Sequence, residues 1–367
     1  MVAFSNATKM DLPHLSRDLF CSTWTWMTFS VVNCNLISHC VEECLVPYHH
    51  SLELLLSLPS ILCHCLEMNY TSVYRDGLFQ DQVALVTGGG SGIGLTIATE
   101  LAVLGAVVVI AGRDASKCQA AADATNAKIG QMPAPNDDDT NKRGKLVVGP
   151  STNIRNADQV QALVTHIIET YGALHLLVNN AGGQFISPAA ALSHRGFAAV
   201  VDTNLTGTFL VSQQAFLQYM QEHGGSIVNI TLVNRNGLPG MAHSAAARAG
   251  VENLTRTLAW EWMEHSVRVN CVRPGIVWTD SGFEAYGDAG EEFLAKLLPA
   301  VPAKRLGTPA EVSAAVVWLL SPAASYVTGT AVAVDGGAGA ITLPLMDIPN
   351  QQHLPAYGDA LPAKARL

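Results

Sequence analysis

A glycine-rich turn at Thr87–Gly94 is the part of this 367-residue sequence whose residue types and spacing point most directly to chemistry. It reads Thr-Gly-Gly-Gly-Ser-Gly-Ile-Gly, follows the β-branched run Val83–Thr87 and opens an apolar helical stretch. Glycine permits the sharp turn and lets the backbone approach a phosphate, and the N–H groups at the helix start then face a pyrophosphate. The turn therefore predicts a dinucleotide site with contacts from Gly88, Ser91, Gly92, Ile93 and Gly94.

The end of the second β-branched run, Val107–Ala111, indicates which dinucleotide is bound. An acidic residue there would hold a ribose 2′-hydroxyl, but Gly112 stands at the expected position and Arg113 follows it. A guanidinium at this place fits a 2′-phosphate with two parallel hydrogen bonds, which predicts NADPH. Asp114 keeps NADH open as an alternative, because it lies about 20 residues past the last glycine. We interpret Asp114 instead as the N-cap of a helix that begins at Ala115.

Short β-branched runs alternate with helix-like segments from Gln82 onwards. Strands that alternate with helices predict a parallel sheet, so we expect an α/β protein with a doubly wound Rossmann fold, a seven-stranded parallel sheet and helices on both faces. The expected strands are Val83–Thr87, Val107–Ala111, Leu146–Val148, Leu174–Asn179, Ser226–Thr231, Val267–Val272 and Ala331–Val334, and the expected helices are 93–104, 156–171, 195–222, 242–264 and 309–320. Thr308, Pro309 and Glu311 mark the start of the last helix as a capping box.

The chain on either side of this pattern, which we place at residues 79–340, differs in character. Residues 1–78 form an N-terminal extension in which residues 19–41 contain no Asp, Glu, Lys or Arg and are long enough to span a bilayer. The extension could be a membrane anchor, a poorly ordered segment or sequence that the mature protein lacks, with Met68 as a start site; we favour the last two. Residues 341–367 are expected to form a C-terminal tail.

Composition excludes several classes of partner. The net charge is −9, only 14% of the residues are charged and no basic run occurs, so we expect no nucleic acid partner. Six of the eight cysteines lie before residue 66, so the main body is typical of a protein made for a reducing compartment. The spacing of these cysteines matches no zinc pattern, and we expect no metal site.

Further motifs carry a family resemblance. Asn179–Gly182, Asn204–Gly207, Pro274-Gly275 and Val334–Gly337 fall after the glycine-rich turn in the order and spacing of the short-chain dehydrogenase/reductase family. The resemblance runs from about Leu78 to Gly337. It implies further cofactor contacts from Asn153, Ile154, Asn180, Ala181, Gly182, Arg248, Pro274, Gly275 and Thr279, with Thr279 placed to meet the nicotinamide amide.

The catalytic positions depart from this family. Where the family has a Tyr followed four residues later by a Lys, this chain has Ser244 and Arg248, and the upstream Ser position holds Thr231, or Leu232 if the loop is one residue shorter. Asn204 matches the family's structural and catalytic Asn. A Ser hydroxyl is a poor acid near neutral pH, so carbonyl reduction is disfavoured. Reduction of a conjugated double bond asks only for hydrogen-bond donors to a thioester oxygen, which Ser244, assisted by Thr231 or by a water on Asn204, could supply.

His243 precedes these residues and leaves two interpretations open, a structural donor beside a helix start or a proton source. Finer motifs, including Asn180–Phe185 and Pro302–Gly307, resemble the branch of peroxisomal trans-2-enoyl-CoA reductases. That resemblance implies NADPH-dependent reduction of the 2,3 double bond of an acyl-CoA thioester in fatty-acid elongation, and a homo-oligomer.

The chain's last residues, Ala365, Arg366 and Leu367, resemble a peroxisomal address and predict an import receptor as partner and the peroxisome as location. Two alternatives to the enoyl reductase remain. One is a 3-oxoacyl or alcohol dehydrogenase of the same family, which lacks its usual Tyr. The other is a nucleotide-binding sensor or subunit that has lost catalysis.

Overall fold

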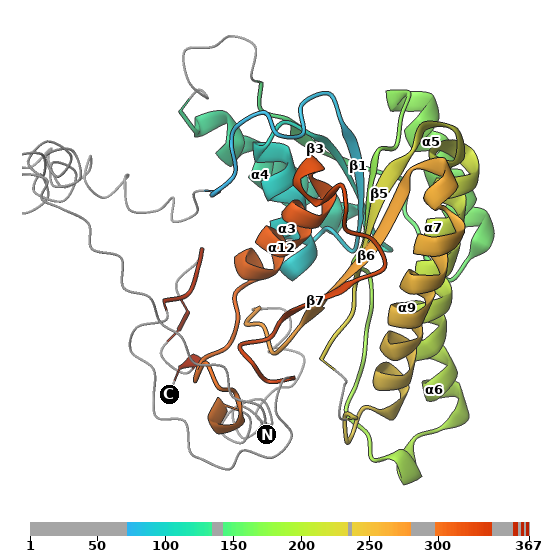
Figure 1. Cartoon of the computed structure of the whole chain (residues 1–367), viewed down its shortest axis with the longest axis vertical. Helices are drawn as coiled ribbons and strands as arrows, with labels where there is room; N and C mark the ends of the chain where they lie inside the picture. Colours follow the sequence, from blue (N-terminus) through green and yellow to red (C-terminus); the bar gives the residue numbers. More distant parts are fainter. Residues whose placement is uncertain are drawn as a thin grey trace, which may run out of the picture. The chain divides into compact units, whose positions relative to one another are not determined.

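The computed structural model describes residues 72–133, 142–233, 237–279, 298–339, 355–358, 361–362 and 365–366, all of which belong to one compact unit. Within them, seven parallel strands form a single sheet in the order β3-β2-β1-β4-β5-β6-β7 (Figure 1). The strands are β1 Val83–Thr87, β2 Val107–Ala111, β3 Lys145–Val148, β4 Leu176–Asn179, β5 Gly225–Ile230, β6 Val267–Pro274 and β7 Ala331–Val334. The strand order reverses between β1 and β4, and in sheets of this kind ligands bind at the carboxyl ends beside that point.

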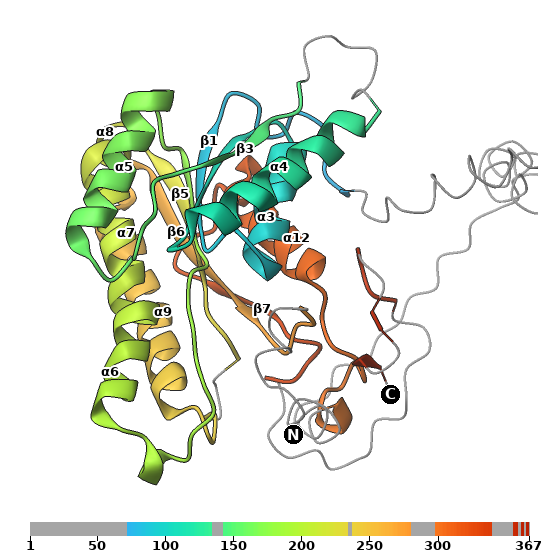
Figure 2. The same cartoon turned by 180° about the vertical axis from the view of Figure 1, so that it is seen from behind.

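Helices cover both faces of the sheet (Figures 1 and 2). One layer contains α3 (Gly92–Val103), α4 (Ala115–Gln131) and α12 (Pro309–Leu320), and the other contains α5 (Ala157–Tyr171), α7 (Gly207–Ala215) and α9 (Ala242–Glu261). Each layer encloses its own cluster of buried apolar side chains against the sheet. The inner strands β1, β2, β4 and β5 are buried on both faces, and the parallel sheet with helices on both sides confirms the doubly wound fold expected from the sequence.

The long helix expected at 195–222 is present but uneven. It begins as α6 (His194–Val201), widens into a π-helical segment at Asp202–Thr206, continues as α7 and widens again at Phe216–Met220. Such π-helical segments are frequent at functional sites. The first of them carries Asn204, whose side chain is fully buried.

Residues just before β1 already belong to the domain, although we expected the extension to run to residue 78. The Ser72 hydroxyl donates to Glu100 at 2.9 Å, and the Tyr74 hydroxyl donates to the carbonyl of Ala314 at 2.6 Å. The domain therefore begins before residue 79. The uncharged stretch at 19–41 lies outside the described residues, and no described helix is long and apolar enough to cross a membrane.

The described parts of the C-terminal tail pack on the domain. Leu361 and Ala365 are buried in a small apolar cluster with Leu298 and Leu306, and the Leu306 N–H donates to the Ala365 carbonyl at 3.1 Å. The tail also accepts a hydrogen bond at 2.6 Å from Thr308, the N-cap of α12. The described residues of the tail thus contact Leu306 and Thr308, and the structure confirms the predicted capping box at Thr308 and Glu311.

His175 makes the start of the sheet sensitive to acid. Its Nδ1 accepts the N–H of Val83 at 3.0 Å, and burial, followed by the charge on His223, lowers its pKa below the usual range. A His with a lowered pKa binds its proton more readily in the unfolded chain, so stability is lost as the pH falls below about 6.5. We expect the free energy of unfolding to decline there by up to about 1.4 kcal/mol per pH unit from this group.

The measurement is urea unfolding between about pH 5 and 8. His175→Asn retains an acceptor close to Nδ1 but does not titrate, so it should flatten the decline. His166→Asn, at an exposed position on α5, is the control and should keep the wild-type slope. A decline that persists unchanged in His175→Asn would assign it to other groups.

Candidate nucleotide-binding and active site

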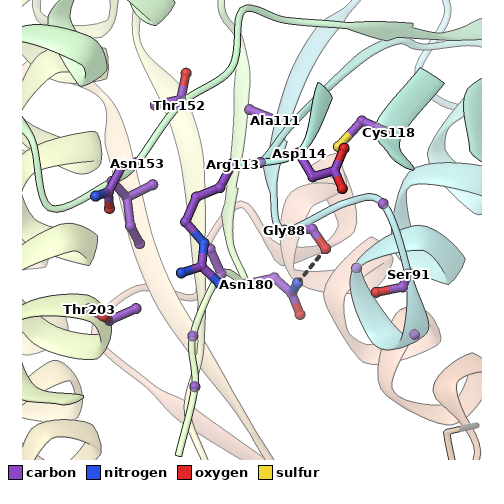
Figure 3. Close-up of a pocket in the computed structure, with 18 of the residues that line it drawn as sticks. Gly88, Ser91, Ala111, Arg113, Asp114, Cys118, Thr152, Asn153, Asn180 and Thr203 are labelled. Atoms are coloured by element: carbon purple, nitrogen blue, oxygen red, sulfur yellow. Dashed lines mark hydrogen bonds between the residues drawn. The ribbon is translucent and has the colours of Figure 1, made fainter. Parts of the chain in front are cut away.

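A cavity of about 920 Å³ lies at the carboxyl ends of β1, β2 and β4 (Figure 3). Its position matches the point where the strand order reverses. Its walls include twelve of the residues predicted to bind the cofactor: Gly88, Ser91, Gly92, Ile93, Gly94, Arg113, Asn153, Ile154, Asn180, Ala181, Gly182 and Thr279. The structure thus brings together in one cavity residues from five separate parts of the sequence.

The glycine-rich turn has little room for side chains. Gly88 has a φ of +67°, and its N–H donates to the Ala111 carbonyl at 2.7 Å. A Cβ at Gly94 would collide with Asn180 Nδ2 and would lie 2.5 Å from the Gly88 carbonyl oxygen. Asn180 Nδ2 donates to the carbonyls of Thr87 and Gly88 at 3.1 and 3.2 Å, so the end of β4 holds the turn in shape (Figure 3).

Basic side chains line the cavity at the end of β2. Arg113 extends into the cavity, and Lys117 and Arg155 lie on the same walls (Figure 3 labels the first). Sequence reasoning missed the last two, although Lys117 stands one helical turn past Arg113. A Cβ at Gly112 would lie 3.2 Å from the buried Cys118 Sγ, which leaves little space there for an acidic side chain.

Asp114 caps α4, as predicted. Its Oδ1 accepts the Lys117 N–H at 2.9 Å and the Ser116 hydroxyl at 2.6 Å. The Ser116 bond, more than the others, lowers the pKa of Asp114 below its usual range and keeps the carboxylate ionised. Asp114, the residue on which the NADH alternative rests, is therefore hydrogen-bonded at a helix start, where negative charge is stabilised.

Arg248 is a buried cation below the cavity. Its Nη1 donates to the carbonyl of Ile230, and its Nη2 lies so close to Gly182 that a Cβ there would collide with it. Burial lowers the pKa of Arg248 to about 10, so the side chain stays charged at neutral pH. Among the described residues Arg248 has no ion-pair partner, and its buried Nε has no hydrogen-bond partner. An unneutralised cation and a cradle closed to side chains both fit an anionic nucleotide cofactor.

Ser244 is fully buried four residues earlier on the same face of α9. Its hydroxyl donates to Gln184 Oε1 at 2.7 Å. Because the amide oxygen faces Ser244, the Nε2 donors of Gln184 are directed elsewhere. Gln184 was absent from the predicted site, and the only signal in the sequence was its place directly after the Asn180–Gly183 motif.

Two of the predicted catalytic residues, Asn204 and Thr231, form hydrogen bonds with backbone groups. Asn204 donates to and accepts from the backbone of Gly183, at 2.8 and 3.1 Å, so its amide holds the loop after β4. The Thr231 hydroxyl donates to the Val272 carbonyl at 3.2 Å, which uses its single proton. No hydrogen bond joins either of these described residues to Ser244, and the assistance that we expect from Thr231, or from a water on Asn204, stays a prediction.

Pro274 and Gly275 lie at the end of β6 but do not line the cavity. The Gly275 N–H donates to the Val334 carbonyl at 2.9 Å, and a Cβ there would lie 2.8 Å from Asp335 Cα. This glycine therefore serves the close approach of two chain segments. The loop that follows carries Thr279 to the cavity wall.

Within the described ranges, no group of three or more His, Cys, Asp or Glu side chains could hold a metal ion. Cys118 and Cys271 are both buried free thiols. Burial is the main cause that raises the pKa of each thiol, to about 12 for Cys271. Both are therefore protonated and poorly nucleophilic at neutral pH.

Comparison with known proteins agrees with this geometry. A family model described as enoyl-(acyl carrier protein) reductase matches residues 88–339. The chain is 36% identical to a peroxisomal 2,4-dienoyl-CoA reductase of Danio rerio, over 73% of this chain and 85% of the relative. It is 37% identical to the enzyme of the same name from Rattus norvegicus, over 83% and 91%.

A solved structure is also similar. A citronellol catabolism dehydrogenase from Pseudomonas aeruginosa PAO1 shares 43% identity and superposes with a TM-score of 0.62, covering 74% of this chain and all of that one. A 3-oxoacyl-[acyl-carrier-protein] reductase from Synechocystis is 34% identical, over 70% of this chain and 96% of the relative. Relatives by name thus include reductases of both carbon–carbon and carbonyl groups.

Proposed function

Because the chain belongs to the short-chain dehydrogenase/reductase family, we propose that it uses NADPH to reduce a carbon–carbon double bond conjugated to the thioester carbonyl of an acyl-CoA. The observation that carries this proposal is the Ser244–Gln184 hydrogen bond at the family's Tyr position. This bond leaves the Gln184 Nε2 donors available for a thioester oxygen. Neither Gln184 nor Ser244 is an acid strong enough to protonate an alkoxide.

In the proposed reaction one group of residues binds the cofactor and another stabilises charge on the substrate. The cofactor, when bound, supplies the hydride, and the glycine-rich turn and Arg248 hold its phosphates and ribose. As hydride reaches the conjugated chain, negative charge develops on the thioester oxygen, where hydrogen-bond donors are most effective. Gln184 donates through Nε2, and Ser244 fixes the amide in that orientation. Water then delivers the proton to the α carbon.

Two substrates fit this chemistry. The relatives named 2,4-dienoyl-CoA reductases favour a 2,4-dienoyl-CoA, in which hydride adds to C5, a proton adds to C2 and a 3-enoyl-CoA results. The motifs at Asn180–Phe185 and Pro302–Gly307 favour a trans-2-enoyl-CoA, which takes hydride at C3 and a proton at C2. Both place the charge on the same oxygen, and we propose the dienoyl substrate first.

The test follows NADPH absorbance by stopped flow with 2,4-dienoyl-CoA, trans-2-enoyl-CoA and 3-oxoacyl-CoA of equal chain length. Turnover with the dienoyl or enoyl substrate supports the proposal, and their relative kcat/KM separates the two. NADPH consumption with the 3-oxoacyl-CoA alone would contradict the proposal. Tight NADPH binding without turnover on any of the three would favour a sensor.

Arg113→Glu is expected to weaken NADPH binding by about 10²-fold and NADH binding little, since a carboxylate would replace the cation facing the 2′-phosphate. Lys117→Glu should show the same preference more weakly. The measurement is fluorescence titration with each nucleotide, and Lys128→Glu, at an exposed position near the end of α4, is the control. Equal losses for the two nucleotides would show that the 2′-phosphate lies elsewhere.

We also infer a peroxisomal location, which the peroxisomal relatives and the terminal Ala365-Arg366-Leu367 support. Ala365 is buried and its carbonyl is bonded to Leu306, so an import receptor that reads an extended peptide would first have to release this contact. A fluorescent fusion with and without the last three residues tests the location. If the two fusions have the same distribution in the cell, these three residues do not act as a peroxisomal address.

A further inference from the structure

His243 lies at the start of α9 and takes the place of a missing helix cap. The N-cap residue, Met241, has no side-chain oxygen, and the N–H of Ser244 is instead accepted by His243 Nδ1 at 2.7 Å. This bond satisfies one of the free N–H groups of the first turn. It also fixes the tautomer, because an Nδ1 that accepts carries no proton, so Nε2 carries it.

The helix cap does not explain the other ring nitrogen of His243, Nε2, which carries a proton. The side chain is fully buried, and Nε2 has no hydrogen-bond partner in the structure. A buried donor without a partner is rare in folded proteins and calls for a specific explanation such as a ligand. A cap alone would use Nδ1 and gives no reason for a second, unsatisfied polar atom.

Geometry relates this nitrogen to the active site. The two nitrogens lie on opposite sides of the imidazole ring, so Nδ1 on the α9 backbone turns Nε2 away from that backbone. The ring packs edge-on against Phe185, with centroids 4.5 Å apart and an interplanar angle of 77°. Phe185 lines the cavity and directly follows Gln184, which is bonded to Ser244. His243 is thus next in sequence to Ser244, and its ring contacts the residue that follows Gln184.

We propose that His243 Nε2–H is a second hydrogen-bond donor to the thioester carbonyl of the bound acyl-CoA, alongside the Gln184 amide. The inference rests on the proposed function and adds a group that neither the family motifs nor the comparisons assign. Two converging donors are what a site that stabilises a developing oxyanion requires. The donor remains unsatisfied until the substrate arrives, so its hydrogen bond forms with substrate and strengthens as charge develops.

Two substitutions separate the cap from the donor. Asparagine places an oxygen near the position of Nδ1, so His243→Asn keeps the acceptor for Ser244 and loses the Nε2 donor. Glutamine places an N–H near Nε2, so His243→Gln keeps the donor and loses the acceptor. We expect His243→Asn to unfold at nearly the wild-type temperature with a kcat about 10²-fold lower. His243→Gln should be less stable and should recover most of the kcat.

A second readout reports the hydrogen bond without turnover. Isotope-edited infrared spectra of a ¹³C=O-labelled dienoyl-CoA bound with NADP⁺ should show a carbonyl stretch at lower frequency in the wild type than in His243→Asn. His166→Asn, at an exposed position of α5, should match the wild type in every measurement. The proposal is overturned if His243→Asn retains wild-type kcat and carbonyl frequency, or if its loss follows stability and His243→Gln fails to recover activity.

The two proposals fail differently. If the wild type reduces none of the conjugated substrates, the proposed function is wrong. The carbonyl frequency then still decides the role of His243 toward a bound acyl-CoA, because it does not depend on turnover. If the wild type is active and the frequency is the same in His243→Asn, only the second donor is wrong.

Discussion

Gly94→Ala should lower NADPH affinity by about 10²-fold, because the added methyl group meets backbone that cannot move away. Its Cβ would lie 2.5 Å from the Gly88 carbonyl oxygen and would collide with the Asn180 amide that fixes the turn. Gly88 is itself held by a hydrogen bond to Ala111 on β2, so relief would require the turn to shift relative to the sheet. The N–H groups that face the pyrophosphate would shift with it.

The matched control is Gly130→Ala in α4, where an added Cβ would meet nothing within 4 Å. An alanine in a helix is more favourable than glycine, so this variant should bind NADPH normally and be slightly more stable, by about 1 kcal/mol at most. Fluorescence titration with NADPH and thermal unfolding measure both effects. Normal NADPH affinity in Gly94→Ala would show that this turn does not hold the cofactor.

The fold could be predicted because its signals are local and repeated. The bounds of β1, β2 and β7 follow from short runs of β-branched residues, which a sheet buried on both faces requires. The caps Asp114 and Thr308 were likewise readable, since each stands at a fixed offset from the helix it starts. The π-helical widening around Asn204 leaves no comparable pattern, and only tertiary contact reveals it.

The cofactor side of the site was more predictable than the substrate side. A glycine-rich turn binds through backbone groups, so the sequence alone places it beside β1 and the helix that follows. Hydrogen bonds between side chains 60 residues apart, such as Ser244 to Gln184, depend on how the start of α9 meets the loop after β4. The same limit applies to Asn204 and Thr231, whose hydrogen bonds to Gly183 and Val272 on other segments could not be predicted from residue type.

The hydrogen bond of Ser244 changes the interpretation of this residue, which stands at the family's Tyr position. From residue types alone, the Ser244 hydroxyl was the obvious donor to substrate. In the structure the proton of that hydroxyl is directed at Gln184 Oε1. A hydroxyl has one proton to donate, so in the proposed mechanism Ser244 acts through Gln184 as a positioning residue and the substrate meets the Gln184 amide.

Gln184→Ala is expected to lower kcat by about 10²- to 10³-fold, the usual cost of removing one donor to a developing oxyanion. NADPH affinity should stay near the wild-type value, because the side-chain hydrogen bonds that hold the turn and Arg248 come from Asn180 and Ile230 and not from Gln184. Gln119→Ala, on the exposed face of α4, is the control for loss of an amide and should be fully active. Steady-state kinetics with 2,4-dienoyl-CoA, combined with NADPH titration, measure both effects.

Ser244→Ala tests the order of action. Without the hydroxyl the Gln184 amide can rotate, so kcat should fall by about tenfold or more while an amide donor remains available. In the double variant Gln184→Ala/Ser244→Ala, kcat should equal that of Gln184→Ala alone, since Ser244 has no effect once its partner is absent. Additive losses would instead show that Ser244 reaches the substrate independently of Gln184.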